Sequence, residues 1–118
     1  MTIEEFLTAR LDEEQASAEE AAAHASAEDH PGMEWFANNA DSSGDAIVAM
    51  YPARALAEIA AKRAIIELWE YRWQEANDAT DQDMNAMYAS QATGLGNAVR
   101  FLAKVYTDHP DYDPDWRP

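Results

Sequence analysis

Apolar residues recur every three or four positions along three stretches of the chain, which predicts three helices. The first stretch opens with Thr2–Glu5, a capping-box pattern in which a Thr is followed three residues later by a Glu. Helical spacing continues through Leu11 into an alanine-rich segment, so we expect a helix over residues 3–28. Beyond Gln15 the apolar face is alanine only, and it either packs closely on another helix or projects into solvent.

A second helix is predicted over residues 52–76 and a third over residues 81–106. Pro52 suits the first turn of a helix, and Thr80 is a plausible cap for the third. Gly94 and Gly96 each cost about 1 kcal/mol relative to alanine in a helix, so we expect a kink or a division there. The prediction is a mainly α fold of three long, mostly antiparallel helices in a single domain over residues 1–118.

Two segments lie outside the helical pattern. Between the first and second helices, turn-forming residues separate two short apolar runs, which predicts a small β-hairpin over residues 34–50. After Thr107, prolines and aspartates alternate with aromatic residues. We expect an extended C-terminal strap, with Tyr112 and Trp116 as anchors packed on the first and third helices. The alternative is a hook that engages a partner.

The net charge of the chain restricts the kinds of molecule that it can bind. The chain has 23 acidic and 8 basic residues, a net charge of −15, and its first 50 residues include a single base, Arg10. Such a chain repels nucleic acid and anionic membranes, so we expect neither as a direct partner and favour a basic protein. The absence of cysteine, the acidic N-terminus and the lack of a long apolar run predict a soluble, cytoplasmic protein.

Acidic residues repeat every seven positions on the first predicted helix and form a candidate binding face: Glu5, Asp12, Glu13, Glu19 and Glu20. Seven helical residues rise about 10.5 Å, whereas duplex DNA carries a charge about every 1.7 Å. One row is therefore sparse for a nucleic-acid mimic, although a dimer would double it. The alternative is a solvated helix face that keeps the protein soluble.

Aromatic residues form a second candidate binding set: Trp35, Phe36, Trp69, Trp73, Tyr112 and Trp116. Together with Met84 and Met87 they exceed what a thin three-helix core needs, and Trp, Tyr and Met are enriched at the centres of protein interfaces. This favours a protein partner or a homodimer.

Catalytic and metal-binding patterns are weak. The histidines, His24, His30 and His109, do not share one helix face, and we expect no metal, cofactor or catalytic residue. Carboxylate pairs at Glu67/Glu70 and Asp78/Asp81 have the spacing with which all-helical nucleotide pyrophosphatases hold magnesium. A small magnesium-dependent hydrolase is therefore a third alternative, although no basic cluster stands near to hold phosphate.

Three stretches, residues 6–13, 52–66 and 105–118, together resemble a family of small proteins of unknown function from actinobacteria and their phages. The resemblance covers about half the chain, and the tail is its most specific part. It implies no enzyme class, and its phage association implies that a host component is the partner. We expect a non-catalytic protein with a host-interaction or regulatory role.

Overall fold

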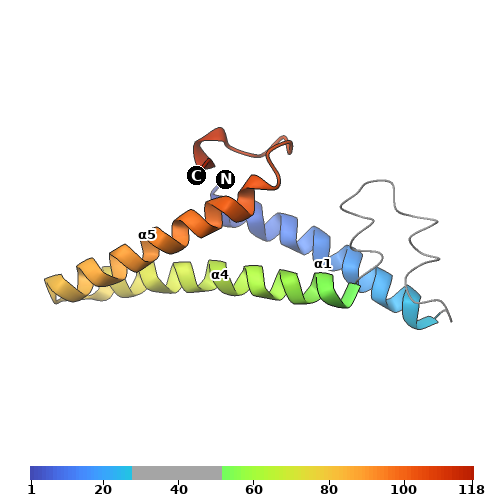
Figure 1. Ribbon diagram of the computed structural model, residues 1–118, viewed down its shortest axis with the longest axis horizontal. Helices are drawn as coiled ribbons and strands as arrows, with labels where there is room; N and C mark the ends of the chain where they lie inside the picture. The colour runs from blue at the N-terminus through green and yellow to red at the C-terminus, as the bar shows by residue number, and fades with distance from the viewer. Residues whose placement is uncertain (28–51) are drawn as a thin grey trace. The chain divides into compact units, whose positions relative to one another are not determined.

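The computed structural model describes residues 1–27 and 52–118. Over these residues the chain forms three α-helices, α1 (Ile3–Ala27), α4 (Pro52–Asp78) and α5 (Gln82–Lys104), followed by a short 3-10 helix, η1 (Pro114–Trp116) (Figure 1). The predicted mainly α fold is confirmed, with helix ends within two residues of those expected. The hairpin expected over residues 34–50 lies outside the described residues.

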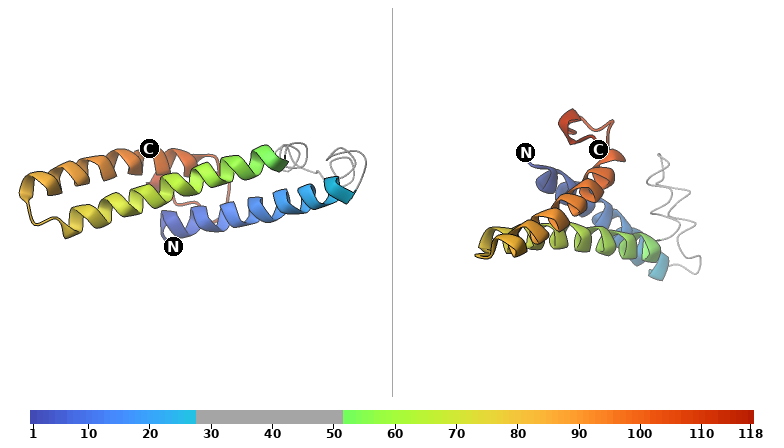
Figure 2. Two further views of the ribbon diagram at one scale, coloured as in Figure 1. Left: turned by 90° about the horizontal axis from the view of Figure 1, so that it is seen from below. Right: turned by 60° about the vertical axis from the view of Figure 1, so that its left-hand side comes forward.

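The chain divides into two compact units. Unit 1 contains Met1–Thr8 and Lys62–Pro118, and unit 2 contains Ala9–Ala61. Helices α1 and α4 each contribute residues to both units. The second half of α4 and the whole of α5 lie side by side in unit 1 as an antiparallel helical hairpin (Figures 1 and 2).

The start of α1 is held by the capping box that the sequence predicts. The Thr2 N–H donates to the Glu5 carboxylate at 2.9 Å, and the Glu5 N–H donates to the Thr2 hydroxyl at 3.1 Å. The alanine face beyond Gln15 is buried, because Ala18 and Ala21 are both 0% exposed. Of the two alternatives for that face, close packing is therefore correct for these residues.

The α4–α5 hairpin turns at Ala79–Asp81, where the cap differs from the one expected. Asp81, not Thr80, caps α5, because its carboxylate accepts the N–H groups of Asp83 at 2.8 Å and Met84 at 3.1 Å. The Asn85 amide donates to the last-turn Ala76 carbonyl at 2.5 Å, which ties the two helices together at the turn. Asp81 is the N-cap because it directly precedes Gln82, the first residue of α5.

Helix α5 is one continuous helix, so of the two alternatives expected at Gly94 and Gly96, a kink or a division, the division is wrong. Helix propensity alone would weaken this point, but tertiary contact overrides it. Gly96 packs against α4: a Cβ added to it would lie 3.2 Å from the Trp69 Nε1 atom. The glycine therefore allows close approach of the two helices.

None of the helices within residues 1–27 and 52–118 is both long and apolar enough to cross a membrane.

Candidate functional site

The C-terminal tail packs around one fully buried side chain, Phe6 on α1. Four rings surround it, with centroid distances of 5.1 Å to Trp116, 5.5 Å to His109, 5.9 Å to Tyr106 and 6.1 Å to Tyr112. Three of these contacts are edge-to-face, the geometry that aromatic quadrupoles favour. We call Phe6 and these four side chains the aromatic cluster; it fixes the tail on the first turn of α1.

Turns, and not the extended conformation expected, shape the tail, whose predicted anchors Tyr112 and Trp116 both pack against Phe6 of α1. The His109 N–H donates to the Tyr106 carbonyl at 2.9 Å, and the Tyr112 N–H donates to the His109 carbonyl at 3.0 Å. Asp113 then caps η1 by accepting the Asp115 N–H at 2.9 Å. Because aspartates and a histidine satisfy the local N–H groups, the chain can turn back repeatedly and bring several rings onto Phe6.

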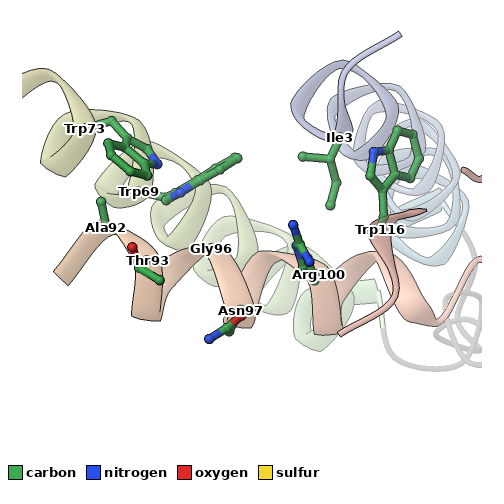
Figure 3. Close-up of a pocket in the computed structure, with 9 residues that line it drawn as sticks. All are labelled: Ile3, Trp69, Trp73, Ala92, Thr93, Gly96, Asn97, Arg100 and Trp116. Atoms are coloured by element: carbon green, nitrogen blue, oxygen red, sulfur yellow. The ribbon is translucent and has the colours of Figure 1, made fainter. Parts of the chain in front are cut away.

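A cavity of about 400 Å³ lies beside the aromatic cluster within unit 1 (Figure 3). Its walls come from four elements. Trp69 and Trp73 are on α4, Ile3 is at the start of α1 and Trp116 is on η1, while α5 supplies the remaining lining residues: Ala92, Thr93, Gly96, Asn97 and Arg100. We call this space the tryptophan pocket. Its volume falls in the range of about 300–1,000 Å³ that is usual for ligand sites.

The pocket is hollow because α5 presents small side chains opposite the indoles. Ala92, Gly96 and Arg100 repeat every four residues, so they share one face of α5. Ala92 is fully buried, and Gly96 lies against the Trp69 ring. Small residues on this face leave room above it, into which the larger Arg100 side chain extends.

Arg100 dominates the electrostatics of the tryptophan pocket. Among the lining residues that the structure describes, it is the only one with an ionisable side chain. No carboxylate within residues 1–27 and 52–118 forms an ion pair with it. Figure 3 shows its guanidinium rising between Trp69 on one side and Ile3 and Trp116 on the other. In a strongly acidic protein, the described lining of this pocket thus carries a formal positive charge.

A second, smaller hollow of about 250 Å³ lies beside α4 and is lined by Thr8, Arg63, Ile66, Glu67 and Glu70. Near it, partial burial raises the pKa of the Glu4 carboxyl above its usual value, and the charges of Glu70 and Glu5 raise it further. The carboxylates of Glu4, Glu5 and Glu70 therefore repel one another.

The carboxylate pairs considered for magnesium are not brought together. Glu70 and Asp78 are eight residues apart on α4, which separates them by about 12 Å along its axis. Asp81 is engaged in capping α5. No cluster of three metal-ligating side chains occurs in the described part of the chain. His109 accepts the Asp111 N–H at its Nδ1, at 3.0 Å, while His24 and His30 lie outside the residues whose side chains are described.

The aromatic residues predicted to form a binding set separate into three groups. Trp69, Trp73 and Trp116 converge on the tryptophan pocket. Tyr112 is 8% exposed and serves the aromatic cluster, so its side chain is not available as a surface contact. The other two, Trp35 and Phe36, lie outside the described residues.

All five acidic side chains predicted as a binding face are exposed: Glu5, Asp12, Glu13, Glu19 and Glu20. Some are already engaged on their own helix. Glu5 belongs to the capping box, the Arg10 guanidinium donates to Glu13 at 3.1 Å, and the Gln15 amide donates to Glu19 at 3.0 Å. The Arg10 ion pair offsets the charge of Glu13, whereas the other two hydrogen bonds occupy carboxylate oxygens and leave their charge in place.

Sequence reasoning missed the residues that α5 contributes to the pocket. In the sequence, Arg100 is only a basic residue near the end of a helix, where it suits the helix dipole, and Gly96 only a residue that weakens the helix. The available signal was spacing: Ala92, Gly96 and Arg100 repeat every four residues on α5, as do Trp69 and Trp73 on α4. Two small residues opposite two large flat ones indicate a close helix crossing with a recess beside it.

The fold and the site define a small, acidic, mainly helical protein with an aromatic pocket between a helical hairpin and its C-terminal tail. The chain belongs to the family of unknown function DUF6221, which it matches over residues 1–118. The match extends beyond the half of the chain on which the resemblance was recognised. No curated protein matches the chain. No solved structure matches it either.

Proposed function

We propose that this protein works by binding a protein partner, with the tryptophan pocket at the centre of the interface, and that it is not an enzyme. The observation that carries the proposal is the convergence of Trp69, Trp73 and Trp116 on one cavity, with Trp73 38% exposed. Tryptophan and arginine supply most of the strong anchors in protein interfaces, and anchors sit in pockets near the interface centre.

The surface around the pocket supports an interface of larger extent. Seven large apolar side chains on α4, α5 and the residue after α5 are 38–73% exposed: Leu68, Tyr71, Trp73, Met84, Met87, Phe101 and Val105. Single exposed apolar residues are normal on any protein. Here they accumulate on the helical hairpin that also supplies most of the pocket, which favours an apolar contact over a purely electrostatic one.

The chemistry of the pocket favours binding over catalysis. The Thr93 hydroxyl donates to the Ala89 carbonyl at 2.8 Å, so its proton is already engaged in the helix. No carboxylate, histidine, lysine, tyrosine or cysteine lines the pocket within the described residues, and these are the side chains that usually act as general acids and bases.

The resemblance to proteins of actinobacterial phages supplies the expectation that the partner is a host protein. A basic partner surface would suit the net charge of −15. The proposal therefore combines an apolar centre with an electrostatically favourable periphery.

A nucleic-acid mimic is the second candidate, and the exposure of the five predicted acidic side chains on α1 is the observation that favours it. A mimic would lose affinity steeply with added salt, because its partner normally binds a polyanion. An interface centred on indoles would lose much less.

Affinity capture from an actinobacterial lysate at low and high salt separates the two. Wild type should retain the same protein at both salt concentrations. Trp73→Ala should lose it, and Tyr71→Ala, outside the pocket, should reduce the amount retained much less. Tyr71 is the matched control because it is an aromatic residue on the same helix, 57% exposed, that does not line the pocket. Capture that fails at high salt and depends on Asp12 and Glu19 would instead support the mimic.

A further inference from the structure

The tryptophan pocket combines flat apolar walls with one cation that has no carboxylate partner among the described residues. Figure 3 places Trp69 and Trp73 toward one end of the pocket and Ile3 and Trp116 toward the other, with the Arg100 guanidinium between them. The walls suit a flat apolar group, because indoles pack well against rings in offset or edge-to-face geometry. The guanidinium suits a carboxylate, which it can bind through two parallel hydrogen bonds.

The charge of the pocket contrasts with that of the protein. Acidic residues outnumber basic ones 23 to 8 in the chain, yet the described lining of this pocket contains one arginine and no acid. Arg54 and Arg72, by comparison, pair with Glu58 and Glu75 on their own helix. An arginine without a carboxylate partner among the described residues, beside three indoles, is complementary to an anion that carries an apolar group.

A hydrogen-bond acceptor in the pocket points to a peptide. Because the Thr93 hydroxyl gives its proton to the Ala89 carbonyl, its oxygen can only accept a further hydrogen bond. A peptide supplies an N–H for this oxygen, whereas a simple aromatic acid has no such donor. Carboxylate, ring and N–H occur together in a short acidic–aromatic peptide segment.

We propose that the tryptophan pocket binds an acidic–aromatic peptide segment of the partner, with the ring against Trp69, Trp73 and Trp116 and the carboxylate on Arg100. This inference rests on the proposed function and specifies the group that the partner inserts. It is compatible with a partner that is basic elsewhere. Charges more than about 8 Å apart are largely screened at physiological salt, so the contact with Arg100 decides the local preference.

Three blocked dipeptides test the proposal by NMR titration of the ¹⁵N-labelled full chain: Ac-Asp-Phe-NH₂, Ac-Asn-Phe-NH₂ and Ac-Asp-Ala-NH₂. The Asp-Phe peptide should shift the indole N–H signals of Trp69, Trp73 and Trp116. It should bind about fivefold more tightly than the Asn-Phe peptide, the effect of one partly exposed ion pair. The Asp-Ala peptide, which has the charge without the ring, should bind more weakly than either.

Two variants with the same change in net charge locate the effect. Arg100→Gln should abolish the preference for Asp-Phe over Asn-Phe, and Lys104→Gln should retain it. Lys104 lies one turn further along α5, and its ammonium is 6.0 Å from the Phe101 ring rather than in the pocket lining. Circular dichroism of both variants checks that α5 is intact; if Arg100→Gln is unfolded, Arg100→Lys replaces it and should reduce the preference.

Several results would overturn the proposal: equal affinity for the Asp and Asn peptides, a preference that survives Arg100→Gln, or phenylacetate binding as tightly as Asp-Phe, which would indicate a free acid. Failure here is distinguishable from failure of the proposed function. Partner capture that depends on Trp73 without any peptide preference rejects only this inference. A clear peptide preference without a captured protein rejects only the proposed function.

Discussion

Gly96 lies directly against the indole of Trp69: a Cβ atom added to this glycine would be only 3.2 Å from the Trp69 Nε1 atom. This contact joins α5 to α4 at the floor of the tryptophan pocket. Gly94, two residues earlier on the same helix, has no atom within 4 Å of an added Cβ. The two glycines therefore occupy opposite environments, although the sequence presents them as a pair.

Alanine substitutions should separate the two glycines. Gly94→Ala should raise the free energy of unfolding by about 0.5–1 kcal/mol, because alanine is the better helix former and the added methyl has open space. Gly96→Ala should gain less or lose stability, since the indole must move by a few tenths of an ångström. Urea unfolding followed by circular dichroism measures both. Equal stabilisation by the two substitutions would contradict the close packing of Gly96.

Phe6 should be the most sensitive position of the aromatic cluster. Phe6→Ala removes a fully buried ring that contacts four others, so we expect a loss of about 3–5 kcal/mol in the free energy of unfolding. Phe101→Ala is the control, because Phe101 is 56% exposed, and its loss should be much smaller. Urea midpoints provide the comparison. Similar losses in the two variants would show that the tail does not pack around Phe6.

Tyr112 has a buried hydroxyl without a hydrogen-bond partner in the described part of the chain. Tyr112→Phe should therefore be neutral or raise the free energy of unfolding by about 1 kcal/mol, because a buried unsatisfied polar group is unfavourable. Tyr112→Ala should lower it by about 3 kcal/mol through loss of the ring. Thermal melts of both variants measure the difference. A clearly destabilised Tyr112→Phe would mean that the hydroxyl has a partner.

Glu4 should make stability depend on pH. Its pKa is raised above the usual 4.5, so the folded protein holds more protons than the unfolded chain between the two pKa values. Stability therefore falls as pH rises through that window, and the full unfavourable effect is present at neutral pH. Glu4→Gln should raise the melting temperature at pH 7, and this gain should disappear below pH 4.5.

The control for Glu4 is Glu20→Gln, which makes the same change in net charge at an exposed position of α1. Melting curves from pH 3 to 8 should show a smaller effect for this variant. If the two variants behave alike, general charge repulsion and not the environment of Glu4 explains the pH dependence.

The helices could be predicted from the sequence because capping and apolar periodicity depend on residues close together in the chain. Thr2 and Glu5 form the predicted capping box, and Pro52 begins α4 as expected. Of the kink or division expected at Gly94 and Gly96, the division is wrong, because helix propensity describes an isolated helix, whereas Gly96 is packed against Trp69. Asp81 in place of Thr80 as the cap is a shift of one residue, within the usual uncertainty of helix ends.

The candidate site could be predicted only in part from the sequence. Its aromatic residues were recognisable as residues that favour interfaces, but which of them line the tryptophan pocket and which form the aromatic cluster was not. Tyr112 and Trp116 are four residues apart, yet one is a buried core residue and the other lines the pocket. The role of Arg100 in the pocket lining depends on the packing of α4 and the tail beside it, which the sequence does not show.

The sequence by itself determined three helices, the acidic balance and the aromatic inventory, because capping, periodicity and composition act over a few residues or none. Only the tertiary structure decided that Phe6 and Trp116, 110 residues apart in the chain, lie with ring centroids 5.1 Å apart, and that Arg100 stands among three indoles. Those relationships depend on how whole helices pack and where the tail turns back. They arise from contacts between distant segments, which no local pattern encodes.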